Sequence, residues 1–121
     1  MKTINLDFDQ EAKVSLKLFE KNHYEKLFHV TKNGIDYTWP DVTEVILQVK
    51  KDIGAVPEIE LKLSSGDIAL SPGYMLLKLP ASKTTIQPGT YKTVLLLMQF
   101  SNTKDRIWWH GGECVVKKRG I

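Results

Sequence analysis

The segment IQPGTY, residues 86–91, lies just ahead of TVLLLMQF, residues 93–100, the most apolar run in the chain. Pro88 fixes its own φ at about −65°, and Gly89 can adopt backbone conformations that are closed to L-residues. The segment therefore predicts a tight turn, and the apolar run predicts a buried strand that begins after it. Which side chains of that strand face the interior depends on the orientation of Tyr91.

Alternation of apolar and charged residues predicts strands on both sides of this segment. In VPEIELKLSSG, residues 56–66, Ile59, Leu61 and Leu63 share one face, and glutamate and lysine side chains occupy the other. A period of two is typical of a half-buried strand. Two further segments with the same pattern make strands the dominant element: DVTEVILQVKK, residues 41–51, and YMLLKL, residues 74–79.

Turn residues separate the predicted strands at regular intervals. Asn33-Gly34 favours a type I′ hairpin, because both central residues of that turn need positive φ. A second hairpin is predicted at residues 101–105, between the apolar run and RIWWHGGECVVKK, residues 106–118. Residues 13–18 alternate as a strand, although a short helix with one apolar stripe is the alternative. The whole pattern predicts a β-sandwich of about seven to nine strands.

The IQPGTY segment also matches a feature of immunoglobulin-like sandwiches. In that fold a tyrosine near the start of one strand hydrogen-bonds back to the backbone at a corner between the two sheets. We expect Ile86 to close the core, Pro88 and Gly89 to shape the turn, and Tyr91 to make this hydrogen bond. The predicted fold class is therefore an all-β, immunoglobulin-like antiparallel β-sandwich. A cysteine bridge is absent from it, since Thr93 stands at the position that carries a cysteine in antibody domains.

An inward Tyr91 leaves more apolar side chains than one core needs. With strict alternation, Leu95 and Leu97 face inward as well, and the strand after them carries apolar residues on both faces. Gly111-Gly112 indicates a bulge in that later strand. A large exposed apolar patch is unusual on a monomer, so we expect either residues 4–27, or the Asn33-Gly34 hairpin, or a partner subunit to cover it. The candidate interface comprises Val94, Leu96, Met98, Phe100, Ile107, Trp108 and Trp109.

The length of the chain bounds the number of domains. With 121 residues and a hydrophobic content of 42%, the chain can bury one core and is too short for two ordinary domains. We expect a single domain over residues 1–121, with 1–27 as an N-terminal strand or arm and 28–121 as the core sandwich. The N-terminus has no apolar signal-peptide region, and no apolar run approaches membrane-spanning length. This predicts a cytoplasmic product without a membrane partner.

The formal net charge of +3 is unevenly placed. Residues 101–121 contain five basic residues against two acidic ones. Lys117, Lys118 and Arg119 form a candidate contact with an acidic partner. Three adjacent charges fall far short of a nucleic-acid footprint, so a nucleic-acid partner is not expected.

Residue types that carry catalysis or bind metals are sparse. His23, His29 and His110 lack the spacing of metal-binding motifs. Cys114 is the only cysteine, which excludes an intrachain disulfide and a cysteine-based zinc cluster. Its apolar strand suits a packed thiol better than a nucleophile. The sequence therefore predicts no enzymatic activity, no metal and no cofactor.

The tryptophans provide an alternative functional prediction. If Trp39, Trp108 and Trp109 were exposed, they could form a platform on which sugar rings stack, although such residues more often fill a core or an interface. A carbohydrate-binding sandwich is therefore the second candidate function.

From about Phe28 onward the chain also resembles a known family. The resemblance rests on a series of segments: KNGIDYTW (32–39), VTEVILQVKK (42–51), IELKL (59–63) followed by Ser-Gly-Asp, PASKTT (80–85) before the Gly-x-Tyr strand, and IWWHGGECVVKK (107–118). The series is similar to the small immunoglobulin-like domains of tailed-bacteriophage virion proteins. Lys92-Thr93 replaces the usual aspartate-leucine of that family, and residues 1–27 lie outside the resemblance.

The resemblance implies a virion structural protein without enzymatic activity. Because the domain nearly fills the chain, a capsid-decoration, auxiliary capsid or small adaptor protein is expected rather than a complete tail fibre. Its implied partners are other virion proteins (capsid, tail or fibre subunits) and further copies of itself. It is expected to be made in the bacterial host cytoplasm and to reside in the virion.

Overall fold

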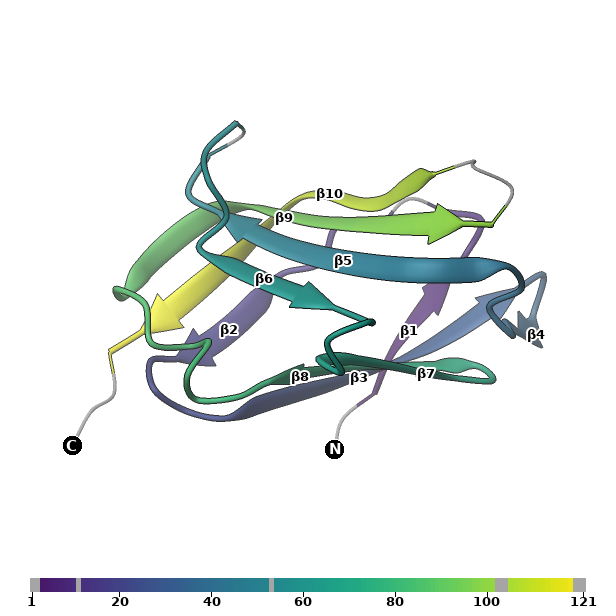
Figure 1. Ribbon diagram of the computed structural model, residues 1–121, viewed down its shortest axis with the longest axis horizontal. Coiled ribbons are helices and arrows are strands. Elements are labelled where there is room, and N and C mark those ends of the chain that lie inside the picture. The colour runs from purple at the N-terminus through teal and green to yellow at the C-terminus, as the bar shows by residue number, and fades with distance from the viewer. Residues whose placement is uncertain (1–2, 11, 53, 102–104, 119–121) are drawn as a thin grey trace.

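The computed structural model describes residues 3–10, 12–52, 54–101 and 105–118, which contain ten β-strands. The strands form two five-stranded sheets that pack face to face (Figure 1). The predicted all-β sandwich is confirmed, and the immunoglobulin-like topology within that class stays a prediction. In chain order the strands are β1 (Thr3–Asp7), β2 (Leu16–Phe19), β3 (Tyr24–Lys32), β4 (Ile35–Asp36), β5 (Val42–Lys50), β6 (Ile59–Lys62), β7 (Ile68–Ser71), β8 (Tyr74–Leu79), β9 (Gly89–Phe100) and β10 (Arg106–Lys117).

The two sheets are named here after their long strands. The β3 sheet has the order β1-β3-β8-β7, with β4 paired to one end of β3, and the β9 sheet has the order β2-β10-β9-β5-β6. Most neighbours are antiparallel, as predicted, but β1 runs parallel to β3 and β2 runs parallel to β10, so both sheets are mixed and differ from the predicted antiparallel arrangement at these edges. The N-terminal segment therefore supplies an edge strand to each sheet. Within the described residues there is no helix, and thus none that could span a membrane.

The hairpin predicted at Asn33-Gly34 is confirmed. Asn33 has a φ of 54° and Gly34 a φ of 78°, as a type I′ turn requires, and they join the antiparallel strands β3 and β4. The hairpin predicted at residues 101–105 is consistent with the antiparallel pairing of β9 and β10, although residues 102–104 lie outside the described part of the chain.

The corner at IQPGTY forms as predicted. The Tyr91 hydroxyl donates a hydrogen bond to the backbone carbonyl of Gln87 at 2.7 Å, and the Tyr91 side chain is buried. Gly89 has a φ of 154°, which L-residues rarely adopt, and Ile86 packs against the core. The corner therefore sets the start of β9 and turns Tyr91 inward.

Strict alternation beyond Tyr91, however, was a wrong prediction. Tyr91 pairs with Cys114 and Val94 pairs with Gly112, so three steps along β9 match two steps along β10. This irregularity is a β-bulge, and it makes the adjacent residues Thr93 and Val94 both buried.

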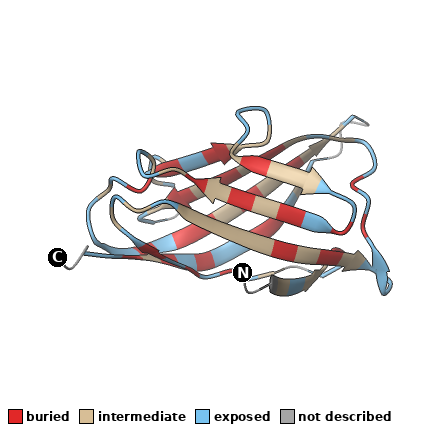
Figure 2. Ribbon diagram, turned by 90° about the horizontal axis from the view of Figure 1, so that it is seen from below, coloured by how far each residue is buried: buried red, intermediate tan, exposed pale blue. Residues whose placement is uncertain are grey.

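Beyond the bulge, the residues of β9 that face the core are those that were predicted to face outward. Leu96 and Met98 face the core and are fully buried. Leu95 and Leu97 face outward and are only partly buried. Figure 2 shows the resulting alternation of buried and less buried residues along the strands.

β10 contains further irregularities of register. The pairing shifts between Ile107 and Trp109, so that the consecutive residues Trp108 and Trp109 are both buried. It shifts again between Trp109 and Gly112, where Gly111 has a φ of 84°. A Cβ on Gly112 would clash with the backbone of Val14. The bulge that Gly111-Gly112 indicated is therefore confirmed.

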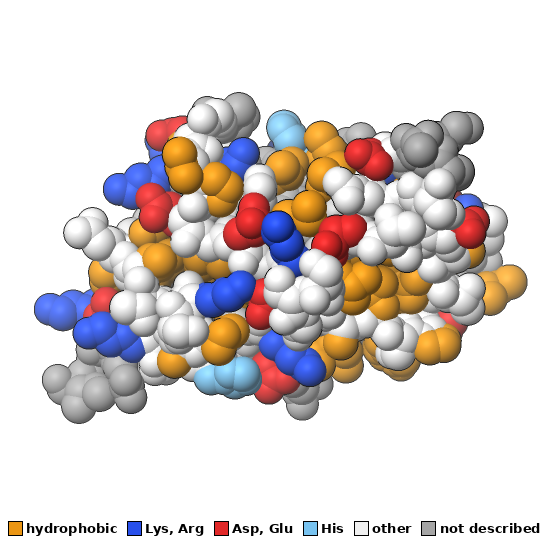
Figure 3. All heavy atoms as spheres, in the orientation of Figure 1, with side chains coloured by type: hydrophobic (Ala, Val, Ile, Leu, Met, Phe, Trp, Pro, Cys, Tyr) orange, Lys and Arg blue, Asp and Glu red, His pale blue; other side chains and the backbone are white. Residues whose placement is uncertain are grey.

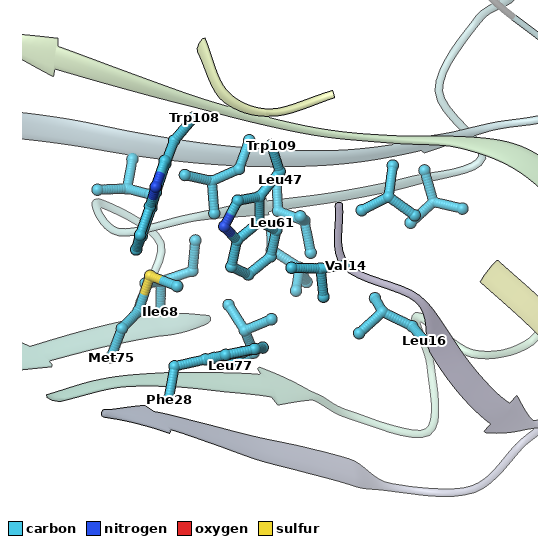
Figure 4. Close-up of a cluster of buried hydrophobic side chains, with 14 of the residues drawn as sticks. Val14, Leu16, Phe28, Leu47, Leu61, Ile68, Met75, Leu77, Trp108 and Trp109 are labelled. Atoms are coloured by element: carbon cyan, nitrogen blue, oxygen red, sulfur yellow. The ribbon is translucent and has the colours of Figure 1, made fainter. Parts of the chain in front are cut away.

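The tryptophans lie in the core, which contradicts the predicted sugar platform. Figure 4 shows Trp108 and Trp109 projecting from the β9 sheet into the space between the sheets, toward Phe28 and Met75 of the β3 sheet. Trp108 and Trp109 are 0% exposed and Trp39 is 8% exposed. The indole N–H of Trp108 donates to the Gln10 carbonyl at 2.9 Å, whereas that of Trp109 has no partner within the described residues. None of the three offers a ring face on which a sugar could stack.

Candidate interaction surface

The structure buries most of the predicted interface instead of exposing it. Five of its seven residues have a relative exposure of 0%: Val94, Leu96, Met98, Trp108 and Trp109. Phe100 is partly buried against the core, and Ile107 is 49% exposed. The prediction that these residues form one outward patch is therefore wrong. The bulges in β9 and β10 turn these side chains into the core of the same domain.

A different group of apolar residues lies on the outer face of the β9 sheet. Ile46 on β5 pairs with Leu97 on β9, and Leu97 also pairs with Ile107 on β10. These three side chains form a continuous row across the sheet, and Leu95 lies on the same face two residues from Leu97. We call Ile46, Leu95, Leu97 and Ile107 the outer row. Figure 3 shows hydrophobic side chains interspersed with charged ones along the upper edge of the molecule.

One member of the outer row had a visible signal in the sequence. In DVTEVILQVKK, Ile46 is an apolar residue between Glu44 and Gln48 on the otherwise polar face of the strand. Leu95 and Leu97 had no such signal, because their orientation follows from the bulge near Thr93. Of the four residues, the interface predicted from the sequence therefore included only Ile107.

Charged side chains border the outer row on both sides. Toward the β6 edge, Glu60 accepts a hydrogen bond from the Gln48 amide at 2.8 Å and lies 3.7 Å from the Lys62 ammonium group. Toward the β2 edge, Lys13 and Glu113 are exposed. Both margins thus carry acidic and basic groups.

Glu44 joins β5 to the turn that follows β6. Its Oε1 atom accepts the backbone N–H groups of Ser64 at 3.0 Å and Val45 at 3.1 Å. Burial acts to raise the pKa of Glu44, but hydrogen bonds from Ser64 and Val45 and the charge of Lys62 outweigh it and lower the pKa. The carboxylate therefore stays ionised in a structural role.

The basic residues near the C-terminus are only partly described. Lys117 ends β10, and both Lys117 and Lys118 are exposed. Arg119 lies outside the described residues. Their contact with an acidic partner stays a prediction.

Two of the surface depressions formed by the described residues open on the ends of the sandwich. One, of about 470 Å³, adjoins the corner and is lined by Ile86, Pro88 and Tyr91 together with charged residues of both signs. The other, of about 350 Å³, is lined by Phe8, Tyr37 and Phe100, with two basic and two acidic residues. Within the second, the Arg106 guanidinium lies 4.4 Å from the centroid of the Phe8 ring. Neither lining has one sign of charge that would select a ligand.

Two of the described titratable groups, Cys114 and His29, are engaged in packing. Burial raises the pKa of Cys114 to about 12, so this thiol is neutral at physiological pH and a poor nucleophile. His29 lies 2.8 Å from Asp36 and 3.3 Å from Asn5 and stacks on Tyr74, which connects four strands of the β3 sheet. Among the described residues, no group of three or more histidine, cysteine or acidic side chains could hold a metal ion.

Comparison with known proteins identifies a structural neighbour but no family. No protein-family model matches the chain, and no curated protein matches its sequence. The structure is similar to the solved N-terminal domain of phage TP901-1 ORF48, with a TM-score of 0.55 and 10% sequence identity. The match covers 96% of this chain and 97% of that one. At this identity the comparison shows a shared fold over nearly the whole of both chains.

Proposed function

We propose that the protein is a non-enzymatic structural component of a tailed-bacteriophage virion and acts as a small adaptor between other virion proteins. The observation that carries this proposal is the fold similarity to a phage protein domain, which covers 96% of the chain. The sequence motifs between residues 32 and 118 support it independently, because they resemble virion domains of tailed phages.

An adaptor role is favoured over capsid decoration. The structural neighbour is the N-terminal domain of its protein, and so one end of a longer chain. A domain at the end of a chain is well placed to attach that chain to an assembly. Capsid decoration is the other candidate, and it differs in the part of the particle where the protein resides.

Binding is favoured over catalysis because several polar side chains of the core and its edges have structural roles. Glu44 and Tyr91 are engaged in backbone contacts, and Cys114 is buried and neutral. The outer row, in contrast, leaves apolar side chains partly exposed on one sheet face. Apolar surface of this kind contributes about 25 cal/mol for each Å² that a partner removes from water.

The proposal is tested on particles of the phage that encodes the chain. We expect mass spectrometry of purified virions to detect the protein in fixed stoichiometry. Separated heads and tails then distinguish the two roles, since an adaptor fractionates with tails and a decoration protein with heads. Absence of the protein from purified particles would refute both.

The surface used in assembly is tested with two matched variants. Ile107→Glu places a charge in the outer row, whereas Ile35→Glu places one on the exposed β3–β4 hairpin of the other sheet, where Ile35 is 73% exposed. We expect Ile107→Glu to reduce incorporation into particles and Ile35→Glu to leave it unchanged. Equal incorporation of both variants would show that the outer row is not the assembly surface.

A further inference from the structure

We infer that the partner of the outer row is a second copy of this chain, packed face to face about a two-fold axis that runs along β9. The inference deepens the proposed function by assigning an occupant to its binding surface. It rests on the order of the strands, the register of the apolar residues and the placement of charges on both margins.

The strand order makes the β9 sheet suitable for such a dimer. β9 is its central strand, with β10 and β2 on one side and β5 and β6 on the other. A two-fold rotation about β9 places the two outer faces against each other, with β9 on β9, β5 on β10 and β6 on β2 of the second copy. Facing sheets of this kind lie about 10 Å apart, and their side chains interdigitate.

The apolar residues of the outer row match themselves under this rotation. Ile46 and Ile107 flank Leu97 at the same level of the sheet, because both pair with it. The rotation keeps this level unchanged, so that Leu97 meets Leu97 and Ile46 meets Ile107 of the second copy. Each apolar residue of the row therefore faces another apolar residue, as a self-complementary interface requires.

The acidic residue on the β6 edge faces a basic one. Glu60 pairs with Gln48, which pairs with Leu95 on β9. At this level on the opposite side, the β10 bulge contains Gly111, and the Lys13 side chain lies beside it, with its Cε atom 3.9 Å from the position of a Cβ on that glycine. The rotation thus places Glu60 opposite Lys13 of the second copy.

A second opposite-charge pair follows from the same operation. Lys50 on β5 pairs with Thr93 on β9. Glu113 lies between two pairs of β10 with β9, Gly112 with Val94 and Cys114 with Tyr91, and therefore at the level of Thr93. Lys50 consequently faces Glu113 of the second copy. Opposite charges that meet at a rim fix the register of an interface and suppress other arrangements.

The oligomeric state of the purified chain tests the inference directly. We expect sedimentation velocity to show a concentration-dependent monomer–dimer equilibrium, which Leu97→Glu shifts to monomer and Ile35→Glu leaves unchanged. Circular dichroism and thermal melts verify that both variants fold, and Ile107→Lys replaces Leu97→Glu should the latter unfold. A monomer at all concentrations, or a dimer insensitive to both outer-row variants, would overturn the inference.

The charge pairs provide a test of the symmetry. Glu60→Lys is expected to raise the dimer dissociation constant at least tenfold, and the double variant Glu60→Lys with Lys13→Glu to restore most of that loss. No restoration would refute the two-fold axis along β9. In addition, Leu97→Cys should be linked to its counterpart by a short bis-maleimide, since the axis brings the two residues together, and Cys114 is buried. Failure of this cross-link in a dimer would also refute the axis.

The two experiments distinguish a chain that does not dimerise from a chain that has no role in the virion. A monomer that still requires Ile107 for incorporation into virions would show that another virion protein occupies the outer row. A dimer that is absent from virions would support the inference and refute the virion role.

Discussion

Replacing Leu96 and Leu97 with alanine, one at a time, tests the bulge that sets the phase of β9. Leu96 is 0% exposed in the core, whereas Leu97 is partly exposed on the outer face. Truncation of a fully buried leucine costs about 2–5 kcal/mol, because transfer free energy is lost and a cavity remains. Leu97→Ala removes partly solvated atoms and leaves no internal cavity, so we expect a loss of about 0.5–1 kcal/mol.

These free energies correspond to distinct melting temperatures. An unfolding entropy of about 2.1 cal/mol/K per residue makes 1 kcal/mol equivalent to about 4 °C in a chain of this length. Leu96→Ala should therefore lower Tm by about 8–20 °C and Leu97→Ala by about 2–4 °C. The measurement is calorimetry or a circular-dichroism melt at a protein concentration below the dimer dissociation constant, so that self-association does not contribute. With strict alternation from Tyr91, Leu97→Ala would lower Tm more than Leu96→Ala. That result would refute the bulge.

Three further predictions concern the corner, the thiol and the buried indoles. Tyr91→Phe removes the hydrogen bond to the Gln87 carbonyl and should lower the free energy of unfolding by about 0.5–1.5 kcal/mol in urea titrations; an unchanged value would mean that the corner adds no stability. Burial raises the pKa of Cys114 to about 12, so the thiol loses its proton at lower pH in the unfolded chain than in the folded one. The contribution of Cys114 to the free energy of unfolding is therefore fully present below about pH 9. Above that pH it falls by about 1.4 kcal/mol per pH unit up to the folded pKa. Cys114→Ala should abolish this component of the slope, and identical pH profiles for both proteins would contradict the burial of the thiol. Trp109→Phe should cost about 1–2 kcal/mol less than Trp108→Phe, because within the described part of the chain the Trp108 indole has a hydrogen-bond partner and the Trp109 indole has none. Denaturant melts giving equal costs would show that Trp109 does have a partner.

Features with a local cause could be predicted from the sequence. Asn33-Gly34 and Gly111-Gly112 mark a hairpin and a bulge because glycine and asparagine tolerate positive φ. The corner was predictable for the same reason, since Pro88, Gly89 and Tyr91 act within six residues of chain. Alternation likewise predicted β5, β6 and β8, where each strand has one buried face.

Features that depend on a distant partner could not be predicted in this way. The bulge in β9 carries no glycine, because it arises from the register of β9 against β10 near Thr93. One unpaired residue there was enough to exchange the two faces of β9, and with them the residues assigned to the core and to the surface. The candidate interface was therefore placed on the wrong face, and only Ile107 was retained.

Parallel pairing with β3 and β10 had no local signal either. The residues of β2 alternate as an edge strand does in any sheet, and a helix was the alternative for the same segment. Nothing in that pattern identifies residues 114–117 as the partners of residues 16–19. The two parallel edge strands are thus a result of tertiary packing.

The pairing of β2 with β10 also constrains how the protein is produced. Among the described strands, β2 pairs with β10 alone, and β10 is the last of the ten in chain order. During synthesis, Leu16 and Leu18 can pair only after residues 114–117 have emerged. We therefore expect this long-range pairing to be a late step of folding. β10 also carries Ile107, so a prematurely terminated chain lacks both the closing strand and part of the outer row. Synthesis to the end of β10 is therefore expected to be a condition both for closing the β9 sheet and for presenting the complete outer row.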